Sequence, residues 1–191
     1  DLGAAFLRDT VRSCIDQIED PGTLCLSVDG EEGGAEAANE LADEFGLAMV
    51  IEQRNRGKLF ALRSGARALL DNPGLRYVAA LDCDADHFPN ELLNFVRCAE
   101  YIRHRAGVAD ILVLGRRLSR HRPMGFLRGE LEELADRVLL DALTFRAAVD
   151  GHPLRLECAT SFDEFPDFHS GYKLFSVETA RRVFLSEPQL A

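Results

Sequence analysis

The sequence lacks an excess of positive charge. It contains 22 Lys and Arg residues and 32 Asp and Glu residues, so its formal net charge is −10. Because a nucleic-acid backbone attracts basic surfaces, this balance excludes a long nucleic acid as a partner. The charge balance still allows the binding of a small anionic ligand, since a metal ion and a few local Lys or Arg residues can offset the ligand's charge.

Cysteine is sparse and shows no metal-binding or redox spacing. The five cysteines contain neither a Cys-x-x-Cys pair nor an even framework, which is typical of small buried residues in a reducing compartment. There is no signal-peptide pattern, and no apolar run approaches the roughly 20 residues that a membrane span needs. We therefore expect a cytoplasmic protein and leave peripheral association with the cytoplasmic face of a membrane open.

The chain also lacks internal repeats, low-complexity tracts and linkers. Its 191 residues suffice for one domain with a sizeable core, and 47% hydrophobic and 28% charged residues exclude a disordered or fibrous chain. We therefore expect a single globular domain over residues 1–191.

Hydrophobic periodicity predicts helices that alternate with short apolar strands. The expected helices cover residues 4–19, 35–45, 58–70, 89–103, 127–147 and 177–185, and the expected strands cover 23–28, 48–52, 77–81, 110–114 and 172–175. This alternation indicates an α/β fold with a mostly parallel central sheet flanked by helices. Residues 149–168 are irregular and rich in Pro, Asp and aromatic residues, which predicts an active-site loop.

Polar segments follow four of the expected strands. They are Asp29, the loop 55–58, the acidic run 82–86 and the segment 115–117. In α/β folds, ligands bind beyond the carboxyl ends of the strands. We therefore expect these segments to share one crevice. Of the five histidines, only His87 and His169 stand beside candidate site residues.

Three aspartates alternate directly after the apolar run Tyr77–Leu81: Asp82, Asp84 and Asp86. Carboxylate oxygens are the ligands that Mg²⁺ and Mn²⁺ prefer. A bound cation would also relieve the repulsion among the three charges. The run therefore predicts a site for Mg²⁺ or Mn²⁺, and a solvated acidic turn is the alternative.

Two other classes of protein share the Asp-x-Asp pattern. A calcium loop of the EF-hand type is excluded, because its Gly and Glu positions hold His87 and Leu93 here. Aspartate-nucleophile phosphohydrolases also place Asp-x-Asp after an apolar strand, with the first carboxylate attacking phosphorus. They usually have Thr or Val where this chain has Asp86, and this reading of Asp82-x-Asp84 stays open as an alternative.

Basic and turn residues provide further candidate ligands for phosphate or sugar groups. The loop Asn55-Arg56-Gly57-Lys58 precedes a helix and could seat phosphate or sugar hydroxyls, although it lacks the spacing of a P-loop. Asp29-Gly30 is suited to accept hydrogen bonds from a nucleobase or ribose. Gly115-Arg116-Arg117 could clamp a phosphate, because Arg matches phosphate with two donors. Each motif taken alone is also typical of a solvated turn.

Together, these segments resemble the family 2 glycosyltransferases over nearly the whole chain. The matching segments are SVDGEEGG for the strand and its Asp-Gly, EQRNRGKLFALRSGARALL for the Asn-x-Gly-Lys helix, and YVAALDCDADHFPNEL for the Asp-x-Asp loop. Two later segments, DILVLGRRL and DFHSGYKLFSVETARRVF, are similar to those of the polyprenyl-phosphate hexosyltransferases, which include the dolichyl-phosphate mannose and glucose synthases.

This resemblance implies a GT-A fold, the fold of nucleotide-diphospho-sugar transferases. The family's first strand, with its Pro-x-x-Asn-Glu loop, would precede residue 1. Residues 1–86 would form the nucleotide-binding half of a single domain, and residues 87–191 the acceptor-side half. The implied activity is a metal-dependent, inverting transfer of a hexose from a GDP- or UDP-linked sugar. The acceptor stays open between a polyprenyl phosphate and a small soluble molecule.

The resemblance also assigns roles to residues. The nucleotide sugar would be bound by Asp29, Arg56, Gly57, Lys58 and Asp82. The metal would be bound by Asp84 together with Asp82 or Asp86, because polyprenyl-phosphate and cellulose-synthase-like patterns select different pairs. An acceptor phosphate would be bound by Arg117 and Lys173. A hydroxyl acceptor needs a base, for which the candidates in order are Asp167, Asp163 and Glu164, whereas a phosphate acceptor needs none.

Overall fold

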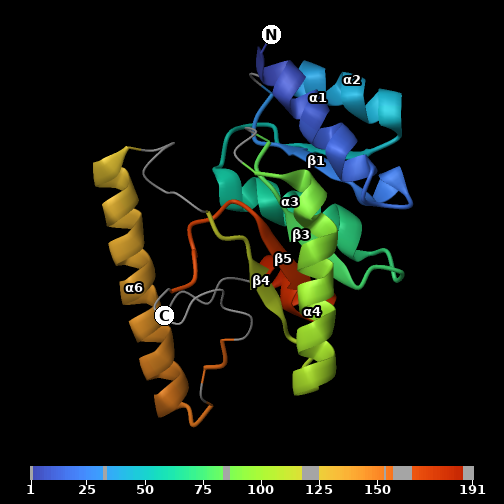
Figure 1. Ribbon diagram of the computed structural model, residues 1–191. Coiled ribbons are helices and arrows are strands. Elements are labelled where there is room, and N and C mark those ends of the chain that lie inside the picture. Colours follow the sequence, from blue (N-terminus) through green and yellow to red (C-terminus); the bar gives the residue numbers. More distant parts are fainter. Residues whose placement is uncertain are drawn as a thin grey trace. The chain divides into compact units, whose positions relative to one another are not determined.

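A computed structural model describes residues 2–31, 34–83, 87–117, 125–152, 154–156 and 165–186 (Figure 1). The chain divides into two compact units. Unit 1 comprises Asp1–Val113 and Leu174–Ala191, and unit 2 is the intervening segment Leu114–Lys173. The expected single domain, with a nucleotide-binding half at 1–86 and an acceptor-side half at 87–191, stays a prediction.

The predicted alternation of helices and strands is present in the structure. The helices are α1 (Leu2–Ile15), α2 (Ala35–Phe45), α3 (Lys58–Leu70), α4 (Leu92–Ala106), α6 (Phe126–Val149) and α7 (Val177–Ala180). The strands are β1 (Cys25–Val28), β2 (Ala48–Ile51), β3 (Tyr77–Ala80), β4 (Leu112–Leu114) and β5 (Lys173–Ser176). Short helical turns cover η1 (Pro21–Thr23), η2 (Pro89–Glu91) and η3 (Arg181–Leu185). Among the helices of the described residues, none is long and apolar enough to cross a membrane.

Glycines set two helix boundaries that the sequence predicts. Gly46 ends α2 in the left-handed conformation with a φ of 71°, which residues with a Cβ adopt reluctantly. Gly57 precedes α3 with a φ of 94°. Both helices therefore begin and end at the predicted residues.

The strands form two small sheets. In the first, β1 and β2 run parallel, with Cys25 opposite Ala48. The second has the order β3-β5-β4. Its β4 and β5 are antiparallel, because the amide of Gly115 bonds to the carbonyl of Tyr172 and that of Ser176 to the carbonyl of Ile111.

The α/β class is thus confirmed, but the expectation of one mostly parallel central sheet is wrong for the described residues. The alternation of strands and helices predicts crossovers that return the chain in the same direction. The chain instead passes from β4 into unit 2 and returns directly beside β4 as β5. β5 therefore runs antiparallel to β4. The hydrophobic periodicity of a segment predicts whether it is a strand, but not the direction in which that strand runs beside its neighbour.

Helices cover both faces of the β3-β5-β4 sheet. On one face, Val78 and Phe175 pack with Ala66 and Leu70 of α3 and with Phe184. The rings of Phe175 and Phe184 meet edge to face at 5.1 Å between centroids. On the other face, Leu174 and Ile111 pack against Ala99 of α4. Neighbouring residues of β5 therefore point to opposite faces, as the pleat of a strand requires.

Helix α3 also packs closely on β1. A Cβ added at Gly65 would lie 3.0 Å from the Cβ of Ser27. The hydroxyl of Ser27 donates to the carbonyl of Ala61 at 2.6 Å. This close approach fixes the start of α3 relative to the end of β1, where the first candidate site residues lie.

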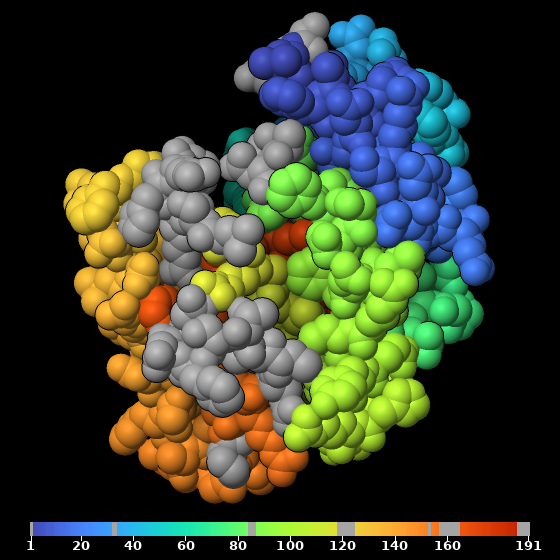
Figure 2. Space-filling view, in the orientation of Figure 1, coloured from blue at the N-terminus to red at the C-terminus, as the bar shows by residue number. Residues whose placement is uncertain are grey.

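In unit 2, the long helix α6 confirms the helix predicted from its leucine spacing. The residues of that pattern are largely exposed, however, at 57% for Leu131, 58% for Leu134 and 60% for Val138. The buried positions are Gly129 and Asp136 on the other side of the helix. The face of α6 that carries Gly129 and Asp136 also carries the half-buried Leu140, whereas the stripe of Leu131, Leu134 and Val138 is exposed. Much of α6, in amber, lies on the surface seen in Figure 2.

Candidate functional site

Asp29 holds the predicted basic loop by its carboxylate. Its Oδ1 accepts the backbone N–H of Arg56 at 2.7 Å, and its Oδ2 accepts that of Gly57 at 2.8 Å. The positive φ of Gly57 turns the backbone at this point. The adjacent Gly30 has a φ of 103° and packs so closely on the loop that an added Cβ would lie 3.1 Å from the amide nitrogen of Asn55. The ends of β1 and β2 are therefore joined at one edge.

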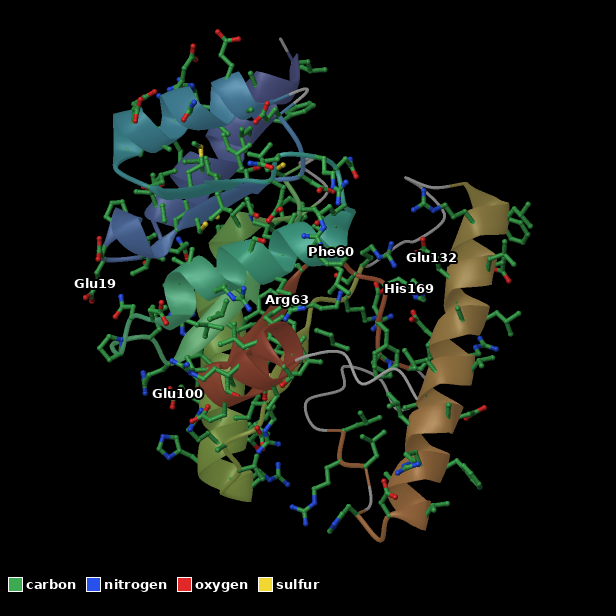
Figure 3. The ribbon with its side chains drawn as sticks, turned by 180° about the vertical axis from the view of Figure 1, so that it is seen from behind. Glu19, Phe60, Arg63, Glu100, Glu132 and His169 are labelled. Carbon is green, nitrogen blue, oxygen red and sulfur yellow. The ribbon has the colours of Figure 1, made fainter. Side chains whose placement is uncertain are left out.

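Lys58 connects this loop to the acidic run after β3. Its Nζ lies 2.5 Å from Oδ2 of Asp82, and the side chains are 58% and 29% exposed. The guanidinium of Arg56 lies 4.0 Å from the ring centroid of Phe60 on the first turn of α3, which Figure 3 labels. The five residues predicted to bind a nucleotide sugar thus form one connected group in unit 1, as expected from their positions after successive strands.

Of the three predicted metal ligands, the structure describes Asp82. Asp84 and Asp86 lie outside the described residues, and Asp82 is paired with Lys58. Within the part of the chain that the structure describes, no three His, Cys, Asp or Glu residues form a metal-binding group. The carboxylate of Asp82, two residues after β3, is nevertheless the kind of oxygen donor that Mg²⁺ or Mn²⁺ prefers.

Unit 2 contains a second charged cluster, centred on Arg117. Its Nε and Nη2 donate to Oδ2 and Oδ1 of Asp167, each at 2.8 Å, and its backbone N–H donates to Oδ2 at 3.2 Å. Nη2 also donates to Oε2 of Glu132 on α6 at 2.9 Å. The Asp167 side chain is 0% exposed and that of Arg117 is 17% exposed. This forked geometry fixes both side chains.

The contacts of Arg117 favour the charged forms of Arg117 and of Glu132. The hydrogen bond to Asp167 raises the pKa of Arg117, although desolvation opposes it. Desolvation acts to raise the pKa of Glu132, but hydrogen bonds from Arg117 and Arg128 outweigh it and lower that pKa. One guanidinium therefore binds two carboxyl side chains.

The structure brings the predicted phosphate ligand Arg117 and the predicted base Asp167 together, so that each neutralises the other. Lys173, the other predicted phosphate ligand, donates from Nζ to the carbonyl oxygen of Ser170. Asp163 and Glu164 lie outside the described residues. The catalytic and acceptor-binding roles of these residues stay predictions.

Asp136 on α6 is a further residue of unit 2 that its place in the sequence did not single out. Its side chain is fully buried, and its Oδ1 accepts the backbone N–H of Phe168 at 3.1 Å and lies 2.7 Å from Nδ1 of His169. Figure 3 labels His169, and Glu132 on α6, in this part of unit 2. The available signal was the pair of acidic residues at 132 and 136, one helical turn apart and on the side of α6 away from Leu131, Leu134 and Val138.

Comparison of the chain with protein-family models and with curated proteins found no match in either case.

Proposed function

We propose that this chain is the catalytic part of a metal-dependent, inverting glycosyltransferase with a GT-A fold. It would transfer a hexose from a nucleotide-diphosphate sugar to an acceptor. The observation that carries this proposal is the connected group of Asp29, Arg56, Gly57, Lys58 and Asp82. These residues follow β1, β2 and β3, and ligands of α/β folds bind beyond such strand ends.

Asp29 would bind the nucleoside. Although both of its oxygens accept a backbone amide, each has a further lone pair that can accept a hydrogen bond from a base or ribose. The amide bonds hold the carboxylate rigidly, so that little side-chain freedom is lost on binding.

Lys58 and Arg56 would offset the charge of the diphosphate. Both side chains are exposed and lie at the start of α3, where the helix dipole also favours an anion. Arg56 keeps its position by stacking on Phe60. These two cations would attract the diphosphate locally, although the net charge of the whole chain is −10.

Asp84, together with Asp82 or Asp86, would hold Mg²⁺ or Mn²⁺, because these carboxylates are the oxygen ligands that such ions prefer. When bound, the ion would stabilise negative charge on the departing nucleoside diphosphate. In the transfer, the acceptor oxygen bonds to the anomeric carbon as the bond from that carbon to the diphosphate oxygen breaks. The electron pair leaves with the nucleoside diphosphate, and the anomeric centre is inverted.

A thermal-stability assay with a panel of sugar nucleotides tests this proposal. GDP-mannose, UDP-glucose and related donors are each added with and without Mn²⁺. We expect at least one donor to raise the melting temperature only when Mn²⁺ is present, since ligand binding to the folded state stabilises it. Failure of every donor would contradict the proposal. Release of phosphate from simple esters would then favour a phosphohydrolase with Asp82 as nucleophile.

A further inference from the structure

The exposed apolar residues of α6 form a regular stripe on one side of the helix. Leu127, Leu131, Leu134 and Val138 follow one another at intervals of four, three and four residues. This spacing is that of a seam at which two helices pair, because it keeps the side chains on one side of an α-helix. Each of the four residues is more than half exposed. We call these four residues the seam of α6.

The contacts of α6 with the rest of unit 2 lie on the side away from the seam. Oδ1 of Asp136 accepts the backbone N–H of Phe168 at 3.1 Å, and Oε2 of Glu132 accepts Nη2 of Arg117 at 2.9 Å. Figure 3 labels Glu132 on this side of the helix. At 3.6 residues per turn, Asp136 points about 170° away from the middle of the seam. All of these residues belong to unit 2, so contacts within this unit orient α6 with its seam outward.

An apolar stripe of this length indicates a docking surface, because soluble proteins seldom expose large contiguous apolar patches to water. The charges of α6 disfavour a lipid surface as its occupant. The helix contains five Asp and Glu residues, three Arg residues and no Lys. Helices that lie on membranes instead carry many Lys and Arg residues on their polar face. The seam therefore suits another helix better than an anionic bilayer.

The seam is complementary to itself when two copies of α6 run antiparallel. Leu127 then lies opposite Val138 of the second copy, and Leu131 lies opposite Leu134 of the second copy. The two-fold axis repeats both contacts, which gives four apolar layers. Every layer consists of Leu and Val side chains, so no polar group is buried in the seam.

Charged residues beside the seam are complementary in the same register. Glu130 of each copy lies beside Arg137 of the other, at the flanking positions where charges determine the partner and the orientation of paired helices. The two-fold axis forms this pair twice. The side chain of Arg137 is 60% exposed and can reach across the pair of helices. The pattern of charges thus selects a second copy of this chain as the occupant.

A parallel pair of α6 helices would lack both features. Asp141 follows Val138 by three residues and occupies the next seam position. A parallel pair would therefore bring the two Asp141 carboxylates face to face, and like charges repel. It would also place Glu130 and Arg137 beside alanines of the second copy, at positions 135 and 142. In the antiparallel register, Asp141 lies beyond the overlap of the two helices.

We propose that two copies of this chain associate through their α6 seams in antiparallel orientation. The overlap, residues 126–139 of each copy, is about 21 Å long. An interface of this size gives a weak dimer that forms as the protein concentration rises. The inference goes beyond the proposed function and does not depend on it, because the group around Lys58 belongs to unit 1.

Sedimentation equilibrium of the purified chain over a range of concentrations tests the proposal. We expect the average mass to rise from that of one chain toward twice that value, with a micromolar Kd. Leu131→Glu places a carboxylate in the seam and should leave a single chain at every concentration. The matched control is Phe145→Glu, because Phe145 is exposed on the same helix but lies beyond the overlap. This control should associate as the wild type does.

An exchange of charges tests the register. Glu130→Arg should raise the Kd by about tenfold or more, because two attractive pairs become repulsive. The double variant Glu130→Arg with Arg137→Glu restores both pairs and should recover most of the affinity. Arg137 also contacts Glu133 at 2.7 Å, so circular dichroism is used to verify that the double variant folds. If it does not fold, Glu130→Arg and Leu131→Glu still decide the proposal.

Four results would overturn the inference. A single chain at every concentration of the wild type would exclude the dimer. Wild-type Kd in Leu131→Glu would show that another surface carries the association, and wild-type Kd in Glu130→Arg would exclude the register. Finally, the wild type could stay a single chain and bind vesicles of phosphatidylcholine and phosphatidylserine, with binding lost in Leu131→Glu. The seam would then be a membrane-binding surface instead.

Discussion

At the scale of single residues, unit 2 contains a buried ion pair between Arg117 and Asp167. Asp167 is 0% exposed at its side chain and depends on Arg117 for compensation. Burying an isolated carboxylate is costly, whereas a forked pair with satisfied hydrogen bonds is tolerated. Arg117 therefore contributes to the folding of unit 2 whatever ligand that unit binds.

Replacement of Arg117 by Ala should destabilise the protein strongly. The change leaves the buried Asp167 without its cation, and breaking such a pair typically costs about 3–5 kcal/mol. Denaturant unfolding of the purified protein measures the loss. The matched control is Arg128→Ala, because Arg128 pairs with the same Glu132 at 3.1 Å but is 69% exposed. That control should cost less than about 1 kcal/mol. Equal losses in the two variants would contradict the assigned importance of the buried pair.

At the scale of elements, the candidate donor site depends on how α3 lies against β1. Lys58 begins α3 and Asp29 follows β1, so a shift between the two elements would separate these residues. The close contact of Gly65 with Ser27 sets the spacing. A residue with no direct part in binding therefore determines the geometry of the site.

Replacement of Gly65 by Ala should destabilise the protein even though Ala favours a helix by about 1 kcal/mol. The added Cβ would lie 3.0 Å from the Cβ of Ser27, and overpacking of this kind costs about 1–3 kcal/mol. We expect a lower melting temperature and weaker donor binding together. Arg67→Ala, at an exposed position of the same helix, is the control and should change neither. An unchanged or raised melting temperature in Gly65→Ala would show that β1 and α3 can move apart without cost.

At the scale of the whole chain, the sequence predicted features that depend on neighbouring residues, such as helix bounds, better than features that depend on residues far apart in the chain, such as strand direction. The bounds of α2 and α3 follow from adjacent glycines and from periodicity, and both are correct. The direction of β5 depends on the return of the chain from unit 2, which no local pattern encodes. For the same reason, the leucine spacing predicted α6 but not that Gly129 and Asp136 are its buried positions.

The candidate site divides in the same way. Asp29, the basic loop and Asp82 are three of the four segments expected to share one crevice, and hydrogen bonds and an ion pair connect these three. That the segment 115–117 joins them stays a prediction. The pairing of Arg117 with Asp167 and of Asp136 with His169 joins residues far apart in the chain. Spacing along the sequence gives no measure of such distances, so these pairs required the structure.

The central claim is that the group around Lys58 binds the diphosphate of a sugar nucleotide, and calorimetry of donor binding with Mn²⁺ tests it most directly. Lys58→Ala is compared with Arg54→Ala, which removes an exposed cation from the same loop. Hydrogen bonds to charged groups contribute about 1.5–3 kcal/mol, so Lys58→Ala should weaken binding by about tenfold to a hundredfold. Arg54→Ala should bind as the wild type does. Wild-type affinity in Lys58→Ala, or an equal loss in Arg54→Ala, would contradict the account.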